Sequence, residues 1–427
     1  MSHYKPYPTY KDSGVEWIGR VPEHWDVSRI KRFSSLRTER CTDVPEGWRY
    51  IGLEDVESGT GQYHPTEGNS RQNDDSTVGV FRSGDVLYGK LRPYLKKAIV
   101  GNSNGVCSTE FLVMQPALMM ARWLHQWLLT TEVTQQIEAG CEGTKMPRAD
   151  WEHVGSIHVP SPSLSEQAEI ISALDRETAR IDALIAKKSR FIELLKEKRS
   201  VLITHAVTKG LNPKANLKDS GVEWIGQVPE HWEVVQSRRL FSERKEKARE
   251  SDFQLTASQK YGVIAQSEFM EREGRRVMVV GKGHDILKHI EPGDFLISMR
   301  SFEGGLEECK FSGCVSSAYV PLTPIKWVWN PFFKYLFKST GYIQALQSTS
   351  DLVRDGQALR FENFSEVPLL RISIDEQRLI AAFLERQLGR IDGLMTKTRL
   401  SIDLLKERRS AFITAAVTGQ IELRGAT

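Results

Sequence analysis

The sequence has few cysteines, and their spacing does not suggest a metal site. The five cysteines, at positions 41, 107, 141, 309 and 314, form no CxxC pair. An odd number of scattered cysteines is typical of reduced thiols and not of a disulfide framework or a zinc site. We therefore predict no disulfide and no metal in this chain.

Long apolar runs are also missing. No segment approaches the ~18 consecutive apolar residues that a helix needs to cross a bilayer. The opening residues, MSHYKPYPTYKD, have neither the apolar core nor the cleavage site of a secretory signal. Both absences predict a cytoplasmic protein with no membrane partner.

Motifs for catalysis are scarce as well. There is no GxxxxGK[ST] phosphate loop and no GxGxxG turn after a predicted strand, so no nucleotide or methyl-donor cofactor is predicted for this chain. The stretch ERKEK at 243–247 contains the E-x-K half of a nuclease motif, with Glu243 and Lys245. We interpret it as a solvated helix face, because such triplets are common in charge-rich stretches. A stand-alone nuclease remains an alternative.

The overall charge is too small to indicate a partner. The chain has 427 residues, enough for two or three domains, and a formal net charge of +3. A nucleic-acid-binding domain is usually more strongly basic than this. Any contact with nucleic acid must therefore come from local patches.

Two repeats organise the chain. KDSGVEWIGRVPEHWDV at 11–27 recurs as KDSGVEWIGQVPEHWEV at 218–234, with 15 of 17 positions identical and an offset of 207 residues. A longer repeat relates 163–210 to 373–420 at an offset of 210 residues. Between these copies lie two dissimilar inserts, insert one (28–162) and insert two (235–372). The sequence therefore predicts one repeated frame around two different domains.

The longer repeat predicts two long helices. Each copy begins with an S-x-x-E capping box, Ser163 to Glu166 and Ser373 to Glu376, and continues with apolar residues in a heptad pattern. At about 1.5 Å per residue, some 40 residues give a helix of roughly 60 Å. For one copy alone, packing on its own domain would be an equal alternative; two matching copies favour an antiparallel coiled coil with a pseudo-twofold axis. The predicted helix-pairing residues are Leu174, Ile181, Ile185, Ile192, Leu195, Leu384, Ile391, Met395, Ile402 and Leu405.

Both inserts predict mixed α/β domains. Short β-branched and aromatic runs punctuated by Gly, Pro and Asn indicate strands, while 121–140 and 330–347 indicate helices. The predicted fold class is α/β (α+β), with two mixed α/β domains separated by the two long helices. The predicted segments are 1–162, 163–210, 211–372 and 373–427.

The strongest nucleic-acid signal is the stretch FRSGDVLYGKLRPYLKK. Between Arg82 and Lys97 it has five basic residues and one acid, with Tyr88 and Tyr94 interleaved. Arg and Lys neutralise phosphates, and Arg can also bond bidentately to guanine. A solvated strand and turn is the alternative. The predicted DNA-binding residues are Lys90, Arg92, Tyr94, Lys96, Lys97, Lys145 and Arg148 in insert one, and Arg275, Arg276, Arg300, Ser301, Arg354, Gln357 and Arg360 in insert two.

Together these features resemble the DNA-specificity subunit of a type I restriction-modification system. The resemblance rests on the GVEWIG-VPEHW phrase and on the twin helices with RID and LLKE. In insert one it rests on GDVLYGKLRPYLKKAIV, VCSTEFLVMQP and GTKMPR, and in insert two on LTASQKYGVIAQSEF, ISMRSFEGG and RDGQALRFENF. It covers essentially the whole chain.

The resemblance implies a subunit that is not catalytic by itself. Each insert would be a target recognition domain that reads one half of an asymmetric, bipartite site in double-stranded DNA, with the two domains about 34 Å apart if they read one face of the duplex. The helices would act as a ruler and as a platform for two modification subunits. Those partners would carry S-adenosylmethionine and methylate adenine at N6, and ATP and magnesium would also belong to partner subunits. Restriction subunits could join to form an endonuclease. A coiled-coil scaffold with no DNA role remains a further alternative.

Overall fold

The computed structural model describes residues 4–65, 77–141, 143, 146–274, 286–298, 305–349 and 359–424. The chain forms two compact units: unit 1 comprises Met1–Lys188 and Leu400–Thr427, and unit 2 comprises Ser189–Arg399. Each unit holds one insert, one copy of the repeated phrase and part of each long helix. The division therefore falls inside the long helices, whereas the segments predicted from the sequence end at the helix ends.

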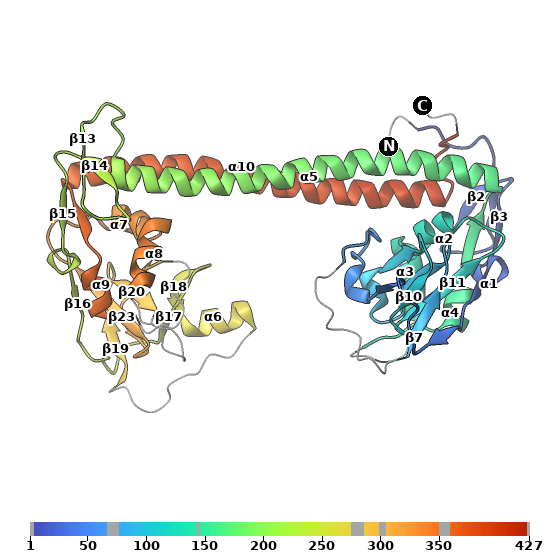
Figure 1. The fold of residues 1–427 in the computed structure, drawn as a ribbon, viewed down its shortest axis with the longest axis horizontal. Helices are drawn as coiled ribbons and strands as arrows, with labels where there is room; N and C mark the ends of the chain where they lie inside the picture. Colours follow the sequence, from blue (N-terminus) through green and yellow to red (C-terminus); the bar gives the residue numbers. More distant parts are fainter. Residues whose placement is uncertain are drawn as a thin grey trace. The chain divides into compact units, whose positions relative to one another are not determined.

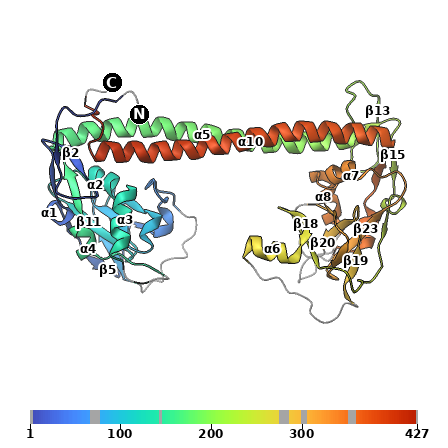
Figure 2. The ribbon, with the colours of Figure 1, turned by 180° about the vertical axis from the view of Figure 1, so that it is seen from behind.

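The two long helices begin and end close to the predicted positions. Helix α5 spans Leu164–Lys209 and helix α10 spans Ile374–Val417. The hydroxyl oxygens of Ser163 and Ser373 accept hydrogen bonds from the backbone N–H groups of Glu166 (3.3 Å) and Glu376 (3.2 Å), which is the first half of the predicted capping box. The segments of α5 and α10 lie side by side within each unit (Figures 1 and 2).

The repeated phrase joins the start of one long helix to the end of the other. In unit 1 the buried Trp25 donates from its indole nitrogen to the Glu166 carboxylate near the start of α5 (3.2 Å). Gly419, just beyond α10, has φ +73° and packs so closely on Pro22 and Trp25 that a Cβ there would clash with Pro22. The helix start and the helix end thus meet at the same tryptophan, so the helices run antiparallel.

Unit 2 repeats this arrangement with the roles of the helices exchanged. Here Gly210, which follows α5 and has φ +72°, packs against the buried Trp232 and beside Glu376 of α10. His231 of the same phrase lies 3.0 Å from the Glu376 carboxylate. Each copy of the phrase therefore contacts both long helices, and we call this arrangement a clamp. One clamp forms in each unit, so the phrase occurs twice.

Most of the predicted helix-pairing residues are buried. Ile185 and Leu405 are half-buried, and the other eight have at most 9% of their surface exposed. Two arginines also occupy the seam: Arg409 Nε lies 3.0 Å from Asp182 Oδ1 in unit 1, and Arg199 Nε lies 3.6 Å from Asp392 Oδ1 in unit 2. Asp392 and Arg409 lie 210 residues after Asp182 and Arg199, so the repeat makes the same polar contact twice.

Insert one is built on two four-stranded sheets, ordered β5-β7-β10-β6 and β4-β11-β8-β9, and β12 returns to pair with β3 beside the repeated phrase. Its core contains Trp123 and Trp127 of α2 and continues onto α5 and the end of α10. The elements of this part of unit 1 are β1 Tyr10–Asp12, β2 Arg20–Pro22, β3 Asp26–Arg29, α1 Ile30–Phe33, β4 Ser34–Leu36, β5 Arg40–Cys41, β6 Arg49–Ile51, η1 Leu53–Asp55, β7 Val78–Phe81, β8 Val86–Gly89, η2 Pro93–Leu95, β9 Ala98–Val100, β10 Gly105–Cys107, β11 Phe111–Pro116, α2 Ala121–Leu128, α3 Thr131–Ala139, α4 Trp151–Ser156 and β12 His158–Ser161.

Insert two contains a four-stranded sheet, ordered β16-β23-β20-β21, and the pairs β17-β18 and β19-β22; β15 of the frame pairs with β24. Phe241, Phe295, Phe333, Phe337 and Phe364 pack together in its core. The elements are β13 Leu217–Asp219, β14 Gln227–Pro229, β15 Glu233–Val235, η3 Ser237–Arg239, β16 Phe241–Glu243, β17 Leu255–Ser258, β18 Gly262–Ala265, α6 Gln266–Glu273, β19 Lys288–Ile290, β20 Phe295–Ser298, β21 Glu307–Glu308, β22 Gly313–Val315, β23 Tyr319–Pro324, α7 Asn330–Leu336, α8 Thr340–Ser348, α9 Phe361–Glu366 and β24 Leu369–Arg371.

The two inserts share an internal ion pair although their sequences barely align. Arg37 binds Asp85 through two hydrogen bonds (2.7 and 3.2 Å), and Arg244 binds Asp294 in the same way (2.6 and 3.1 Å). These residues are equivalent by offsets of 207 and 209, close to those of the frame. The inserts are therefore two versions of one mixed α/β domain, as the sequence predicts.

The helices predicted at 121–140 and 330–347 are each broken in two. The breaks fall at the equivalent residues Thr130 and Ser339, whose hydroxyl groups donate to the carbonyls of Trp127 (2.8 Å) and Leu336 (2.7 Å). Such local side-chain bonds compete with helix continuation. Within the described residues, no helix combines the length and apolarity needed to span a membrane.

Candidate nucleic-acid interface

Backbone hydrogen bonds bring two predicted basic loops of insert one together. After β8, the N–H of Lys90 donates to the Glu110 carbonyl, and the Lys90 carbonyl accepts from the N–H of Ala149 (2.9 Å each). The N–H of Arg92 donates to the Pro147 carbonyl (2.9 Å), and residues 91 and 148 form an isolated β-bridge. Residues far apart in the sequence thus share one edge of the domain.

The loop after β8 is held in a strained backbone conformation. Arg92 and Lys96 have φ values of 53° and 48°, in the left-handed region of backbone conformation that residues other than glycine rarely adopt. Of the three described non-glycine residues with positive φ, these two flank the short turn η2, and the third is Trp327. Each such residue costs about 1–3 kcal/mol, and strain of this kind gathers at functional sites.

The side chains of this basic edge face outward. Arg92 is exposed, and half of the Tyr94 surface is accessible. Arg148 forms an ion pair with Glu110 (2.9 Å) but keeps 59% of its side chain exposed. Lys90 is half-buried and has no acidic partner among the described residues. We call Lys90, Arg92, Tyr94 and Arg148 the basic edge.

Two other predicted lysines are used inside the protein. Lys96 Nζ donates to the hydroxyl of Thr131 (2.9 Å), and Lys97 Nζ donates to the carbonyl of Leu53 (2.6 Å). Burial lowers the pKa of both lysines. Their direct contact with a phosphate stays a prediction, for which each ammonium group keeps two further N–H donors.

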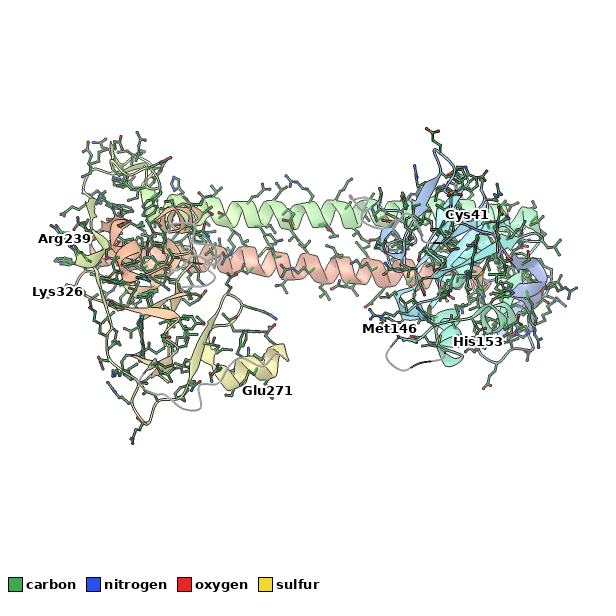
Figure 3. All side chains as sticks on the ribbon, turned by 60° about the horizontal axis from the view of Figure 1, so that its bottom comes forward. Cys41, Met146, His153, Arg239, Glu271 and Lys326 are labelled. Carbon is green, nitrogen blue, oxygen red and sulfur yellow. The ribbon has the colours of Figure 1, made fainter. Side chains whose placement is uncertain are left out.

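A groove beside the basic edge adds residues that the sequence analysis missed. It has a volume of about 410 Å³, and its lining includes Lys90, Arg148, Arg40, Phe111 and Trp151. Arg40 comes from the short edge strand β5 and Trp151 from the start of α4. Met146, labelled in Figure 3 and 55% exposed, belongs to the same late loop as Arg148. No sequence spacing links these residues; only the tertiary fold does.

Most predicted residues of insert two lie outside the described residues. These are Arg275, Arg276, Arg300, Ser301, Arg354 and Gln357; in insert one, Lys145 also lies outside the described residues. Arg360 is described: it is exposed, precedes α9, and its N–H donates to Asn363 (2.9 Å). The DNA contacts of insert two therefore stay a prediction.

The interpretation of ERKEK as a helix face is wrong, because the segment begins in strand β16. There Glu243 forms an ion pair with Lys288 (3.7 Å), and Arg244 bridges Asp294 and Glu246. These charged side chains connect the end of the edge strand β16 to Lys288 of β19 and to Asp294, which lies between β19 and β20. No group of three potential metal-binding side chains occurs in the part of the chain that the structure describes.

The long helices carry a second exposed surface. Heptad position e contacts the inserts: Asp175 of α5 pairs with Arg122 in unit 1, and Arg378 of α10 lies over the ring of Trp329 in unit 2 (4.8 Å). Positions g and c instead carry exposed leucines, which form one stripe along each helix. These are Leu184 and Leu404 in unit 1, and Leu394 and Leu194 in unit 2, with 46–55% of their surface exposed.

The leucines of this stripe are related by the repeat. Leu184 and Leu394, and likewise Leu194 and Leu404, are 210 residues apart. Exposed leucines of this kind at equivalent positions of both copies give each unit a similar apolar patch. We call Leu184 with Leu404 the leucine patch of unit 1, and Leu194 with Leu394 the leucine patch of unit 2.

The fold and the basic edge define a class of protein in which two related α/β domains alternate with two long paired helices. Solved structures of known proteins share this architecture. A chain from a structure that describes complex assembly and conformational transition of the type I restriction-modification system has a TM-score of 0.68 at 18% identity, over 95% of this chain and 99% of that chain. The HsdS subunit from Thermoanaerobacter tengcongensis has a TM-score of 0.51 at 17% identity, over 94% and 98%. The predicted fold is confirmed.

The curated relatives are specificity subunits of type I restriction enzymes. The EcoDI subunit of Escherichia coli is 24% identical over 184 residues, which cover 42% of this chain and 41% of that protein. The MjaVIII subunit of Methanocaldococcus jannaschii is 30% identical over 232 residues, covering 52% and 50%. The chain thus spans less than two thirds of the length of the curated relatives it matches. No protein-family model matches the chain.

Proposed function

We propose that this chain is the DNA-specificity subunit of a type I restriction-modification complex in the cytoplasm. It catalyses no reaction itself, and its two inserts are target recognition domains that each read one half of an asymmetric, bipartite DNA site. The similarity to curated specificity subunits supports this proposal. The observation that carries it is the basic edge, where the fold brings together two basic loops and holds one of them under strain.

The chemistry of the basic edge suits duplex DNA. Arg92 and Arg148 have planar guanidinium groups that can bind a phosphate or the O6 and N7 acceptors of guanine. Tyr94 adds an exposed hydroxyl for a sugar or phosphate contact. The ion pair between Arg148 and Glu110 orients the guanidinium before DNA arrives, which reduces the entropy lost on binding.

The leucine patches support two copies of one partner. In this proposal each patch docks a modification subunit, which carries S-adenosylmethionine and methylates adenine at N6. Because the inserts contact heptad position e, the g and c leucines stay accessible. ATP, magnesium and DNA cleavage belong to restriction subunits that join the complex.

DNA recognition can be tested in a complex reconstituted with modification subunits. Arg92→Ala and Arg148→Ala should each weaken binding to the DNA site that the complex methylates, by about 1–3 kcal/mol. Arg386→Ala, which removes an exposed arginine from α10 in unit 2, is the matched control and should leave binding unchanged. If the complex bound random duplex as tightly as its target, the proposal would be rejected.

Docking can be tested by size-exclusion chromatography of the same complex. Leu184→Asp with Leu404→Asp should release the modification subunit from unit 1, because two charges would enter an apolar contact. Leu400→Asp changes a leucine that is 60% exposed and lies at heptad position f, outside the stripe. Equal loss of the partner in both variants would disprove the assignment of the patch.

A further inference from the structure

A cavity of about 420 Å³ lies within unit 1, between insert one and the two long helices. Its walls come from residues 57–62, Leu129 and Thr130 of the insert, from 182–186 of α5 and from 406–413 of α10. Cavities of this size between packed helices and a neighbouring domain are typical of small-molecule sites. The cavity is separate from the groove beside the basic edge.

The lining combines an apolar wall with groups of both charges. Leu129, Ile185 and Ile413 provide the apolar surface. The charged lining residues are Lys96, Lys406, Arg409, Glu57 and Asp182. A ligand that fits this lining has a flat apolar part, an anionic group and several hydrogen-bond donors.

The cations of the cavity have unused capacity to bind an anion. Arg409 Nε is buried and lies 3.0 Å from Asp182 Oδ1, but the geometry gives it no hydrogen bond. Lys406 is exposed and has no acidic partner in the described part of the chain. A buried donor without a hydrogen bond is costly, so a ligand oxygen that reaches Arg409 Nε is favoured, and the exposed Lys406 adds a second cation to the same lining.

Unit 2 closes its helices onto its insert at the equivalent position. There the hydroxyl oxygens of Ser200 on α5 and Thr340 on α8 lie 3.1 Å apart. Their equivalents in unit 1 are Ser410 and Thr131. Ser410 lines the cavity, and the Thr131 hydroxyl instead accepts a hydrogen bond from Lys96. Insert one thus keeps a space where insert two makes direct contact.

We propose that the cavity of unit 1 binds a nucleotide-sized anion. Its phosphate lies against Lys406 and Arg409, and its sugar or base donors face the carboxylates of Glu57 and Asp182. Its ring packs on the apolar wall formed by Leu129 and Ile185. A bound nucleotide would brace insert one against the helices. The proposal is independent of DNA recognition, since it concerns the chain alone without DNA or partners.

Isothermal titration calorimetry of the full-length chain with adenosine monophosphate tests this site. Lys406→Ala should weaken binding by at least about tenfold, the loss expected for one charge-assisted hydrogen bond. The matched control is Lys196→Ala, which removes the equivalent lysine in unit 2, where it pairs with Glu193 (2.8 Å).

A second variant tests the space itself. Ser410→Trp fills the cavity from an exposed position without changing its charge, so it should abolish binding while circular dichroism stays unchanged. Adenosine and inorganic phosphate should each bind at least about tenfold more weakly than the monophosphate, since each lacks one half of the contacts. Absence of binding by the unaltered chain overturns the proposal, as does equal weakening by the Lys196 and Lys406 variants. Equal affinity for inorganic phosphate would also overturn the proposal, because the apolar wall would then contribute nothing to binding.

Discussion

The two arginine–aspartate contacts of the helix seam should differ in strength although the repeat makes them equivalent. In unit 1 the side chains of Arg409 and Asp182 are 12% and 31% exposed, at a separation of 3.0 Å. In unit 2 those of Arg199 and Asp392 are 41% and 53% exposed, at 3.6 Å. Burial reduces solvent screening, so we expect Asp182→Asn to cost about 1–3 kcal/mol of unfolding free energy, between the values for exposed and buried pairs. Asp392→Asn should cost less than about 1 kcal/mol.

Urea unfolding followed by circular dichroism measures both costs. A double-mutant cycle with Arg409→Gln and its counterpart Arg199→Gln isolates the coupling energy of each pair from other effects of the substitutions. The coupling in unit 1 should exceed that in unit 2. Equal couplings, or a larger one in unit 2, would show that burial does not decide the strength of these contacts.

Three further predictions concern single groups. Burial lowers the pKa of His125 to about 4, so its contribution to stability should be lost as pH falls from the ordinary histidine pKa of 6.5 toward 4; His125→Gln should flatten acid unfolding of unit 1. Burial opposes the charged form of His289, but its hydrogen bonds with Asp252 (2.7 Å) and Glu291 (2.8 Å) outweigh burial and raise its pKa. The stability that His289 contributes should therefore be present at low pH and be lost as pH rises through the raised pKa. NMR titration of the imidazole ring can follow this change. Glu166→Ala should lower the melting temperature more than Glu376→Ala, because Glu166 accepts from Tyr7, Trp25 and His24 whereas the Glu376 carboxylate contacts His231.

The long helices and the division into two related domains could be predicted from the sequence, because they rest on local and periodic signals. Capping residues and heptads act over a few residues, and a repeat is visible without a structure. The breaks at Thr130 and Ser339 were missed, since a single hydroxyl bond to a carbonyl three residues earlier overrides an otherwise continuous helical pattern.

The candidate site was predicted less completely. Lys96 and Lys97 count toward a basic patch in the sequence, and in the fold each ammonium group also donates a hydrogen bond within the protein, to Thr131 and to Leu53. Arg40 and Trp151 reach the groove only through tertiary packing. One signal was available: Arg-x-Glu occurs at 37–39 and at 244–246, at the offset of the short repeat, and it marks the shared ion pair of the inserts.

The clamp formed by each copy of the repeated phrase has a consequence for the gene. Both inserts begin directly after nearly identical residues and end directly before matching helices. Recombination within these flanking stretches can replace one insert with another and leave every clamp contact intact. In a chain with the proposed function, exchange of an insert would change the half-site that is read, but the new insert would still have to match the helix surface at heptad position e, as Arg122 does with Asp175.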